Sequence, residues 1–197
     1  MAIVKINPIR IEGRWRSGIA LDLHTTSSTP TGPNESGHMQ FDTVRPAIAE
    51  LLYRLKNWAD REAAVPIIET AADFLADQRD KFDAIVPVPP SHQRTVQPVL
   101  ILADGIGKAL SLPVLSCIST TRPTSQLKDI TDPEERKKHV EGLYEVDVEQ
   151  TRGLKLLLFD DLFRSGTTMN AITDILLNPG KATVVHALTI TKTRSKR

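Results

Sequence analysis

Residues 156–168 join an apolar run, an acid pair and a short polar turn, and this combination constrains the fold more than any other stretch. Residues 156–159 are all apolar, as expected for a strand buried on both faces of a parallel sheet. Asp160 and Asp161 follow directly, at the expected carboxyl end of that strand. A turn of small and hydroxyl-bearing residues comes next and leads into a helical pattern: Ser165, Gly166, Thr167 and Thr168.

Each part of this stretch has a chemical use. Ligands of open α/β sheets bind outside the carboxyl ends of the strands. A glycine lets a turn run close under a ligand and expose its N–H groups, and the helix start behind it favours an anion. The turn is therefore predicted to hold a phosphate, while the acids should face hydroxyl groups or a hydrated metal ion. The alternative is an ordinary strand–turn–helix whose acids only lie near a helix start.

The same stretch resembles the motif by which type I phosphoribosyltransferases bind 5-phosphoribosyl 1-pyrophosphate (PRPP). The resemblance implies that Asp160 and Asp161 hold the ribose 2- and 3-hydroxyls and that residues 165–168 wrap the 5-phosphate. Arg164 departs from the pattern, because a small hydroxyl residue is usual there. Its side chain either adds a cation to the phosphate pocket or points into solvent.

Length and composition limit the other function classes. A chain of 197 residues fits one domain, or one domain with an appended flap. Its net charge of +1 argues against a nucleic-acid partner. Cys117 is the only cysteine, which excludes disulfide scaffolds and cysteine-based zinc sites. No run approaches the roughly 20 apolar residues of a membrane span, so we expect no membrane association and, by default, a cytoplasmic location.

The N-terminal quarter shows weaker signals. Residues 2–11 and 19–23 are predicted as short strands, a hairpin outside the main sheet, and residues 25–37 as a mobile loop. Asp22 and His24 lie on the same side of a strand, either as part of a site or as an edge-strand hydrogen-bonding pair. We therefore divide the chain into residues 1–41, which form a hood or flap, and residues 42–197, which form the α/β domain.

Two helices and a strand should follow the flap. The helices are predicted from Asp42 or Thr43 to about residue 57 and over residues 66–79, both as packing layers. The strand is predicted over residues 84–88, and a further helix over residues 96–110.

The loop after the predicted strand at residues 84–88 should place a second anion-binding loop beside the first. It holds four candidate residues: Val88, Pro89, Pro90 and Ser91. The Val-Pro-Val-Pro sequence here is similar to the ComF-like branch of the phosphoribosyltransferases, in which this loop binds the pyrophosphate of PRPP. The alternative is a proline-rich turn that binds nothing.

A polar stretch at residues 119–131 follows another predicted strand at residues 113–118. It contains Arg122 and Lys128 in a spacing that again resembles ComF-like proteins, in which this region is the catalytic flexible loop. The resemblance implies that these two cations stabilise the departing pyrophosphate. A solvated connection is the alternative.

Together these features predict an α/β fold with a doubly wound, mainly parallel sheet, and a small N-terminal hood over its carboxyl edge. The resemblance implies a Mg²⁺-dependent phosphoribosyltransferase in which a nitrogen nucleophile, a nucleobase or a related compound, displaces pyrophosphate from ribose C1. Mg²⁺ would be held mainly by PRPP and water, and the protein would be a homodimer. The other hypothesis is a non-catalytic PRPP- or nucleotide-binding protein on the same fold, either regulatory or of the competence (DNA-uptake) type.

Overall fold

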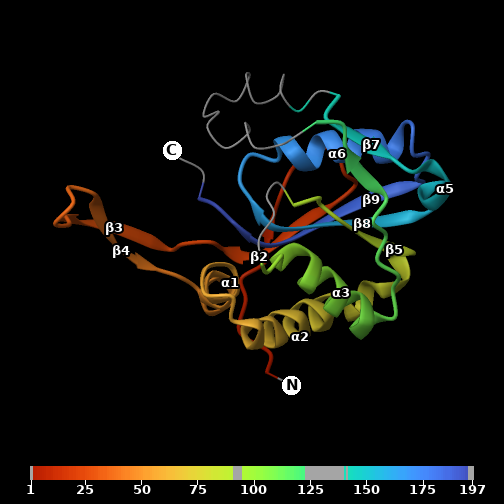
Figure 1. The fold of residues 1–197 in the computed structure, drawn as a ribbon. Coiled ribbons are helices and arrows are strands. Elements are labelled where there is room, and N and C mark those ends of the chain that lie inside the picture. Colours follow the sequence, from red (N-terminus) through yellow and green to blue (C-terminus); the bar gives the residue numbers. More distant parts are fainter. Residues whose placement is uncertain (1, 91–94, 123–139, 141, 195–197) are drawn as a thin grey trace.

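A five-stranded sheet with helices on both faces forms the body of the protein (Figure 1). The computed structural model describes residues 2–90, 95–122, 140 and 142–194. The strand order is β1-β2-β9-β8-β5, and every neighbouring pair except β1–β2 is parallel. The strands have these bounds: β1 Ile9–Arg10, β2 Gly18–Leu23, β5 Ala84–Pro87, β8 Lys155–Phe163 and β9 Val184–Lys192. The predicted α/β class with a mainly parallel sheet is confirmed.

Strand β8 runs through the middle of the sheet, between β5 and β9. Its side chains alternate between two apolar cores. Leu157 and Phe159 belong to the core under the first three helices, whereas Leu156 and Leu158 belong to the core under the last helix. The unbroken apolar run therefore arises because both faces of this strand are buried.

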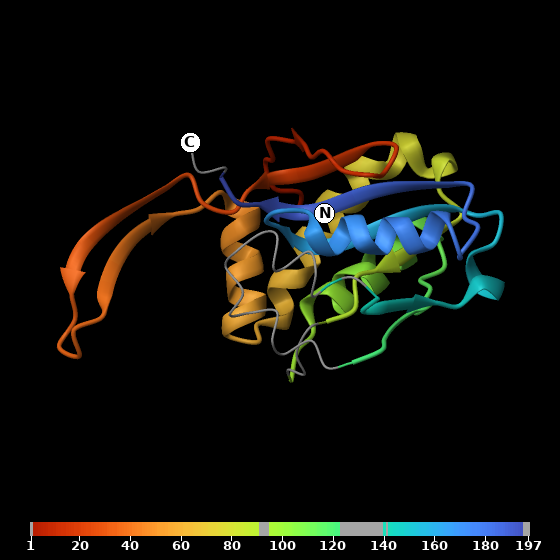
Figure 2. The ribbon, with the colours of Figure 1, turned by 90° about the horizontal axis from the view of Figure 1, so that it is seen from above.

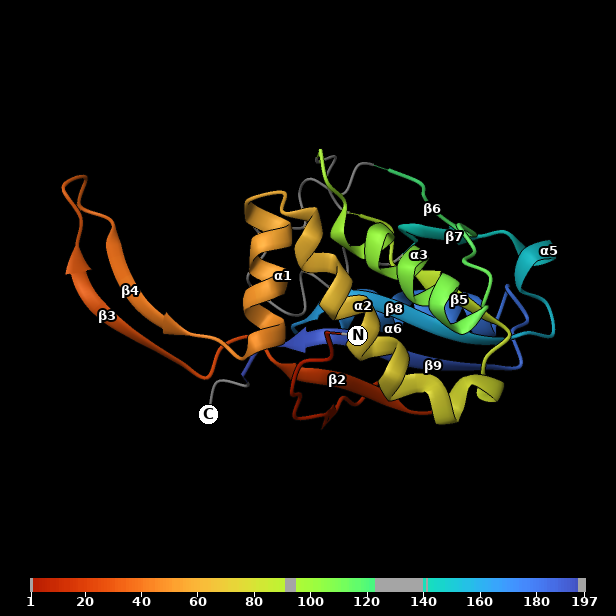
Figure 3. The ribbon, with the colours of Figure 1, turned by 90° about the horizontal axis from the view of Figure 1, so that it is seen from below.

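The helices form one layer on each side of the sheet. Helices α1 Ala47–Asn57, α2 Ala64–Leu75 and α3 Pro98–Leu110 cover one face (Figure 3), and α6 Thr167–Leu177 covers the other. The first helix begins later than predicted, because Asp42 and Thr43 lie in a strand. The second ends earlier than predicted, and the 3₁₀ turn η2 Ala76–Lys81 follows it.

The prediction that the first two strands form a hairpin outside the main sheet was wrong. Strand β2 pairs with β1 on one side and, in parallel, with β9 on the other, so it is part of the main sheet. Ala20 and Leu21 are fully buried as a result. The pairing joins segments about 170 residues apart along the chain, with Ala20 opposite Thr189, and local sequence patterns carry no signal for it.

Residues 27–44 form an antiparallel ribbon, the β3–β4 arm, which includes most of the mobile loop predicted at residues 25–37. Strands β3 Ser27–Pro33 and β4 Met39–Val44 pair along their length, and Asn34 closes the turn by accepting bonds from the N–H groups of Ser36 and His38. The arm leaves the body beside the carboxyl edge of the sheet and points away from it (Figures 1 and 2). It therefore does not cover that edge as the predicted hood would.

A second, smaller ribbon consists of β6 Ile118–Thr120 and β7 Tyr144–Val146, and the short helix α5 Val148–Thr151 follows it. The strand predicted at residues 113–118 is reduced to a single bridge between Val114 and Ile85. Within the described residues, no helix has the length and apolar character needed to cross a bilayer.

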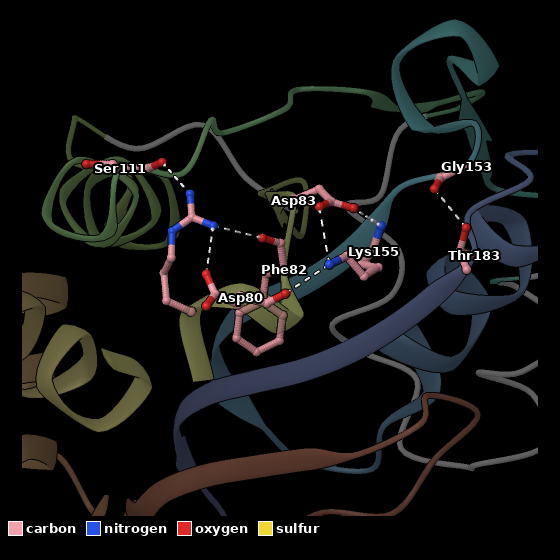
Figure 4. A network of polar contacts seen from close by, with 8 residues as sticks. Asp80, Phe82, Asp83, Ser111, Gly153, Lys155 and Thr183 are labelled. Carbon is pink, nitrogen blue, oxygen red and sulfur yellow. Dashed lines mark hydrogen bonds and ion pairs between the residues drawn. The ribbon is translucent and has the colours of Figure 1, made fainter. Parts of the chain in front are cut away.

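Polar contacts fix the amino ends of the central strands (Figure 4). The Arg79 guanidinium donates to the backbone oxygens of Leu110 and Ser111, at the end of α3. At the start of β8, the backbone N–H of Lys155 donates to Asp83, 2.7 Å away, and its Nζ donates to the carbonyl of Asp80. These contacts hold the strand starts in register, so the carboxyl ends of β5 and β8 meet at a fixed position on the opposite edge.

Candidate functional site

The two acids lie within strand β8, which continues past them to Phe163. Because neighbouring strand residues point to opposite faces, Asp160 lies on the face of α6 and Asp161 on the face of α1. Oδ2 of Asp161 forms an ion pair with Nζ of Lys56, 2.9 Å away, and both side chains are partly buried. The sequence does not indicate this contact between Lys56 and Asp161, because α1 and β8 are more than 100 residues apart along the chain.

Asp160 has a different environment from its neighbour. Burial, followed by the charge of Asp161, raises the pKa of its carboxyl to about 8. The neutral form of this group is therefore favoured, and in that form it can donate one hydrogen bond as well as accept others. Its partner across the sheet is Thr189, whose buried hydroxyl has no hydrogen-bond partner among the described residues. Unsatisfied buried hydroxyls are rare and often mark a place for a bound polar group.

The predicted phosphate turn leads directly into helix α6. Gly166 takes a left-handed φ of +75° and is the residue before the helix. No side chain caps this helix start, so the N–H groups of its first turn are open to an anion. The hydroxyls of Ser165 and Thr167 lie 3.0 Å apart at the same place. Arg164 is exposed, and its charge lowers the pKa of the nearby His24, so it acts on this edge of the sheet.

The loop before β2 packs against this turn and the start of α6. The sequence did not indicate these contacts. The Trp15 ring packs edge-on against Phe163, with 6.1 Å between ring centroids. The backbone N–H of Arg14 donates to Asn170 in the first turn of α6, and its guanidinium pairs with Asp174. A cavity of about 270 Å³ lies within this loop, lined by residues 10–13 and 15–18, and not over the acids.

The second predicted loop reaches the same edge. The N–H of Val88 donates to the carbonyl of Phe159 over 2.8 Å, which places Val88 next to Asp160. Pro89 and Pro90 follow it outward, and Ser91 lies outside the described residues. The structure thus brings the acids, residues 165–168 and residues 88–90 together, as the strand order requires.

The third predicted segment is only partly described. Arg122 follows β6 and is exposed. Lys128 lies outside the described residues. The roles assigned to these two cations therefore stay predictions.

Asp22 and His24 do not form the pair that the sequence suggested. Asp22 is buried and accepts bonds from the backbone N–H groups of Asn7 and Leu23. The Nδ1 atom of His24 instead lies 3.2 Å from the Thr191 hydroxyl. His24 lies near the acids, since the charge of Asp161 acts on its pKa.

A metal ion would find oxygen donors here but no complete cage. Asp160 and Asp161 supply carboxylate oxygens, the type of ligand that Mg²⁺ prefers. Among the described residues, no three His, Cys, Asp or Glu side chains gather as a metal site.

No protein-family model and no curated protein matches this chain. The solved structures that are similar to it in backbone course include these two. One is described as the allosteric regulatory enzyme of purine biosynthesis (16% identity, TM-score 0.49), the other as glutamine PRPP amidotransferase from B. subtilis complexed with ADP and GMP (18% identity, TM-score 0.49). Each match covers 80% of this chain, which spans about a third (34%) of the length of those chains.

Proposed function

We propose that the protein binds PRPP together with Mg²⁺ and transfers its ribosyl 5-phosphate group to a nitrogen nucleophile. The observation that supports this best is that the uncapped start of α6 and the two carboxyl groups lie at the same carboxyl edge of a parallel sheet. A helix start suits a phosphate, and carboxyl groups suit sugar hydroxyls. A sugar phosphate presents both groups at once.

Each part of the substrate has a matching element. The 5-phosphate would accept bonds from the N–H groups of residues 166–168 and from the nearby hydroxyls. The ribose hydroxyls would bind Asp160 and Asp161, and a carboxylate with about four lone-pair sites can do so while keeping its bond to Lys56. The pyrophosphate would lie along residues 88–90.

In the reaction, the bond between C1 and the pyrophosphate oxygen breaks, and the leaving group takes the electron pair. The nitrogen forms a bond to C1 and loses a proton. Positive charge develops on the sugar in an oxocarbenium-like transition state, beside the carboxylate of Asp161. Mg²⁺, held mainly by phosphate oxygens and water, would neutralise the leaving group when bound.

The second candidate is a protein that binds PRPP without turnover. Burial and the charge of Asp161 favour the neutral form of Asp160, and Asp161 is already paired with Lys56. With both charges compensated, the acids would stabilise a developing cation less, while still binding hydroxyl groups.

Calorimetry and a pyrophosphate-release assay test these functions. We expect Mg²⁺ and PRPP to bind together, and pyrophosphate to be released with at least one acceptor from a panel of purines, pyrimidines, orotate and ammonia. Binding without release would favour the second candidate. Absence of PRPP binding would contradict both.

A further inference from the structure

Several cations surround His24 at the end of β2. Burial lowers the pKa of His24, and the charges of Arg45, Lys56 and Arg164 lower it further, while Asp161 raises it. The imidazole is therefore neutral at pH 7 and offers hydrogen bonds without charge. These side chains come from the residue after β2, from α1 and the short segment before it, and from the turn after β8, so they converge only in the folded chain.

The Arg45 side chain stacks on an aromatic ring but has only a weak ion pair with a carboxylate. Its guanidinium stacks over the Tyr53 ring, 4.2 Å from the centroid. Its only ion pair among the described residues is with Glu50 at 3.6 Å, and the Glu50 side chain is 46% exposed whereas that of Arg45 is 20% exposed. Such a loose, solvated contact contributes little. The Nε–H of Arg45 is buried and has no acceptor among the described residues.

A buried N–H of a charged group is costly to leave without a partner, so a native structure that has one calls for an explanation. The Arg45 side chain keeps 20% of its exposure, so the terminal N–H groups of its guanidinium can donate to a ligand oxygen. The planar guanidinium matches a carboxylate in a two-bond geometry, and stacking on Tyr53 already fixes its orientation. The 5-phosphate of PRPP has other donors, at the start of α6.

We propose that Arg45, with Lys56 and His24 beside it, recognises a carboxylate on the nitrogen heterocycle that accepts the ribosyl group. This inference rests on the proposed function and narrows its acceptor to acidic heterocycles. Arg45 is then a specificity residue, whereas the acids and the phosphate turn bind PRPP.

Matched acceptor pairs test this with the unchanged protein. Orotate is compared with uracil, and nicotinate with nicotinamide, in equilibrium binding with and without PRPP and in pyrophosphate release. We expect the carboxylated member of at least one pair to bind about 10- to 100-fold more tightly, the effect of one or two charge-assisted hydrogen bonds. Equal binding within both pairs, or no binding of any member, would overturn the inference.

Variants then locate the effect. Arg45→Gln should abolish the preference for the carboxylated member and leave the Kd for PRPP unchanged, whereas Arg45→Lys should restore part of the preference. Arg54→Gln is the matched control, because Arg54 lies on α1 but pairs with Asp60. If Arg45→Gln weakens PRPP binding as much as acceptor binding, the anion bound there is a phosphate of PRPP, and the inference fails. If PRPP does not bind at all while carboxylates still bind through Arg45, the proposed function fails and the anion site stands.

Discussion

The Nζ atom of Lys56 lies 2.9 Å from Oδ2 of Asp161, and this ion pair joins helix α1 to the central strand β8. The pair lies at the edge of the sheet, where the two side chains keep 27% and 13% of their exposure, and not in the apolar core. Asp161 can therefore accept further hydrogen bonds from a ligand. The contact also ties the N-terminal half of the chain to the acid pair, which makes α1 part of the candidate site.

Replacing both acids tests the proposed sugar contacts. Asp160→Asn combined with Asp161→Asn should abolish detectable binding of PRPP with Mg²⁺, because the amides lose the charge and the acceptor geometry for the hydroxyls. The fold should persist, since both side chains lie at the sheet edge. Calorimetry measures the affinity and circular dichroism the fold; an unchanged Kd in the folded double variant would refute the assigned role.

The raised pKa of Asp160 predicts a pH effect on stability. Its folded pKa of about 8 lies above the ordinary value of 3.8, so between these values the folded protein keeps a proton that the unfolded chain releases. The contribution of this group to the free energy of unfolding is fully present at low pH and is lost as the pH rises toward 8. The loss is about 1.4 kcal/mol for each unit by which the folded and unfolded pKa values differ. In denaturant unfolding at pH 5 and pH 8.5, Asp160→Asn should gain stability relative to the wild type at the higher pH. Parallel pH profiles for the two proteins would contradict the raised pKa.

Gly166 allows a comparison with a matched control. An added Cβ would meet Phe163 at 2.9 Å and would also strain the left-handed backbone. Gly153 has nearly the same φ, +76° against +75°, but its added Cβ would have open space. Gly153→Ala should cost about 1–2 kcal/mol from backbone strain alone. Gly166→Ala should cost more in thermal unfolding and should weaken PRPP binding as well; equal effects of the two substitutions on binding would argue against a phosphate at this turn.

The β3–β4 arm should be dispensable for folding. Its residues are nearly all exposed, including Met39 and Phe41, and an isolated two-stranded ribbon adds little stability. Replacing residues 28–43 by two glycines should leave the free energy of unfolding within about 1 kcal/mol of the wild type, because Ser27 and Val44 are already adjacent. Chemical denaturation measures this. Loss of cooperative unfolding would show that the arm supports the body.

The sequence predicted the elements that local patterns encode. The apolar run of β8, the glycine turn and the helix behind it lie next to one another in the chain, and their arrangement follows from the geometry of a parallel sheet. The pairing of β2 with β9 was missed because it is non-local. The β3–β4 arm was missed because its proline and glycine residues, which are typical of loops, lie here in a bulged ribbon.

The predicted part of the site consists of two segments that each follow a buried strand, residues 88–90 and 160–168. Lys56 and Trp15 reach Asp161 and Phe163 across more than 100 residues of sequence, and ion pairs and ring packing of this kind depend on tertiary structure. The alternation of Asp160 and Asp161 between two faces was also missed. It follows from the continuation of β8 beyond the acids, which the polar sequence there does not indicate.

The position of β2 beside β9 has a consequence for biosynthesis. A ribosome makes the chain from its amino end, so β2 is synthesised about 170 residues before its neighbour β9. Until β9 emerges, one edge of β2 and the apolar residues Ala20 and Leu21 lack their cover. The nascent protein therefore carries an open strand edge for as long as the intervening residues are being made, and the sheet closes only after β9 has emerged.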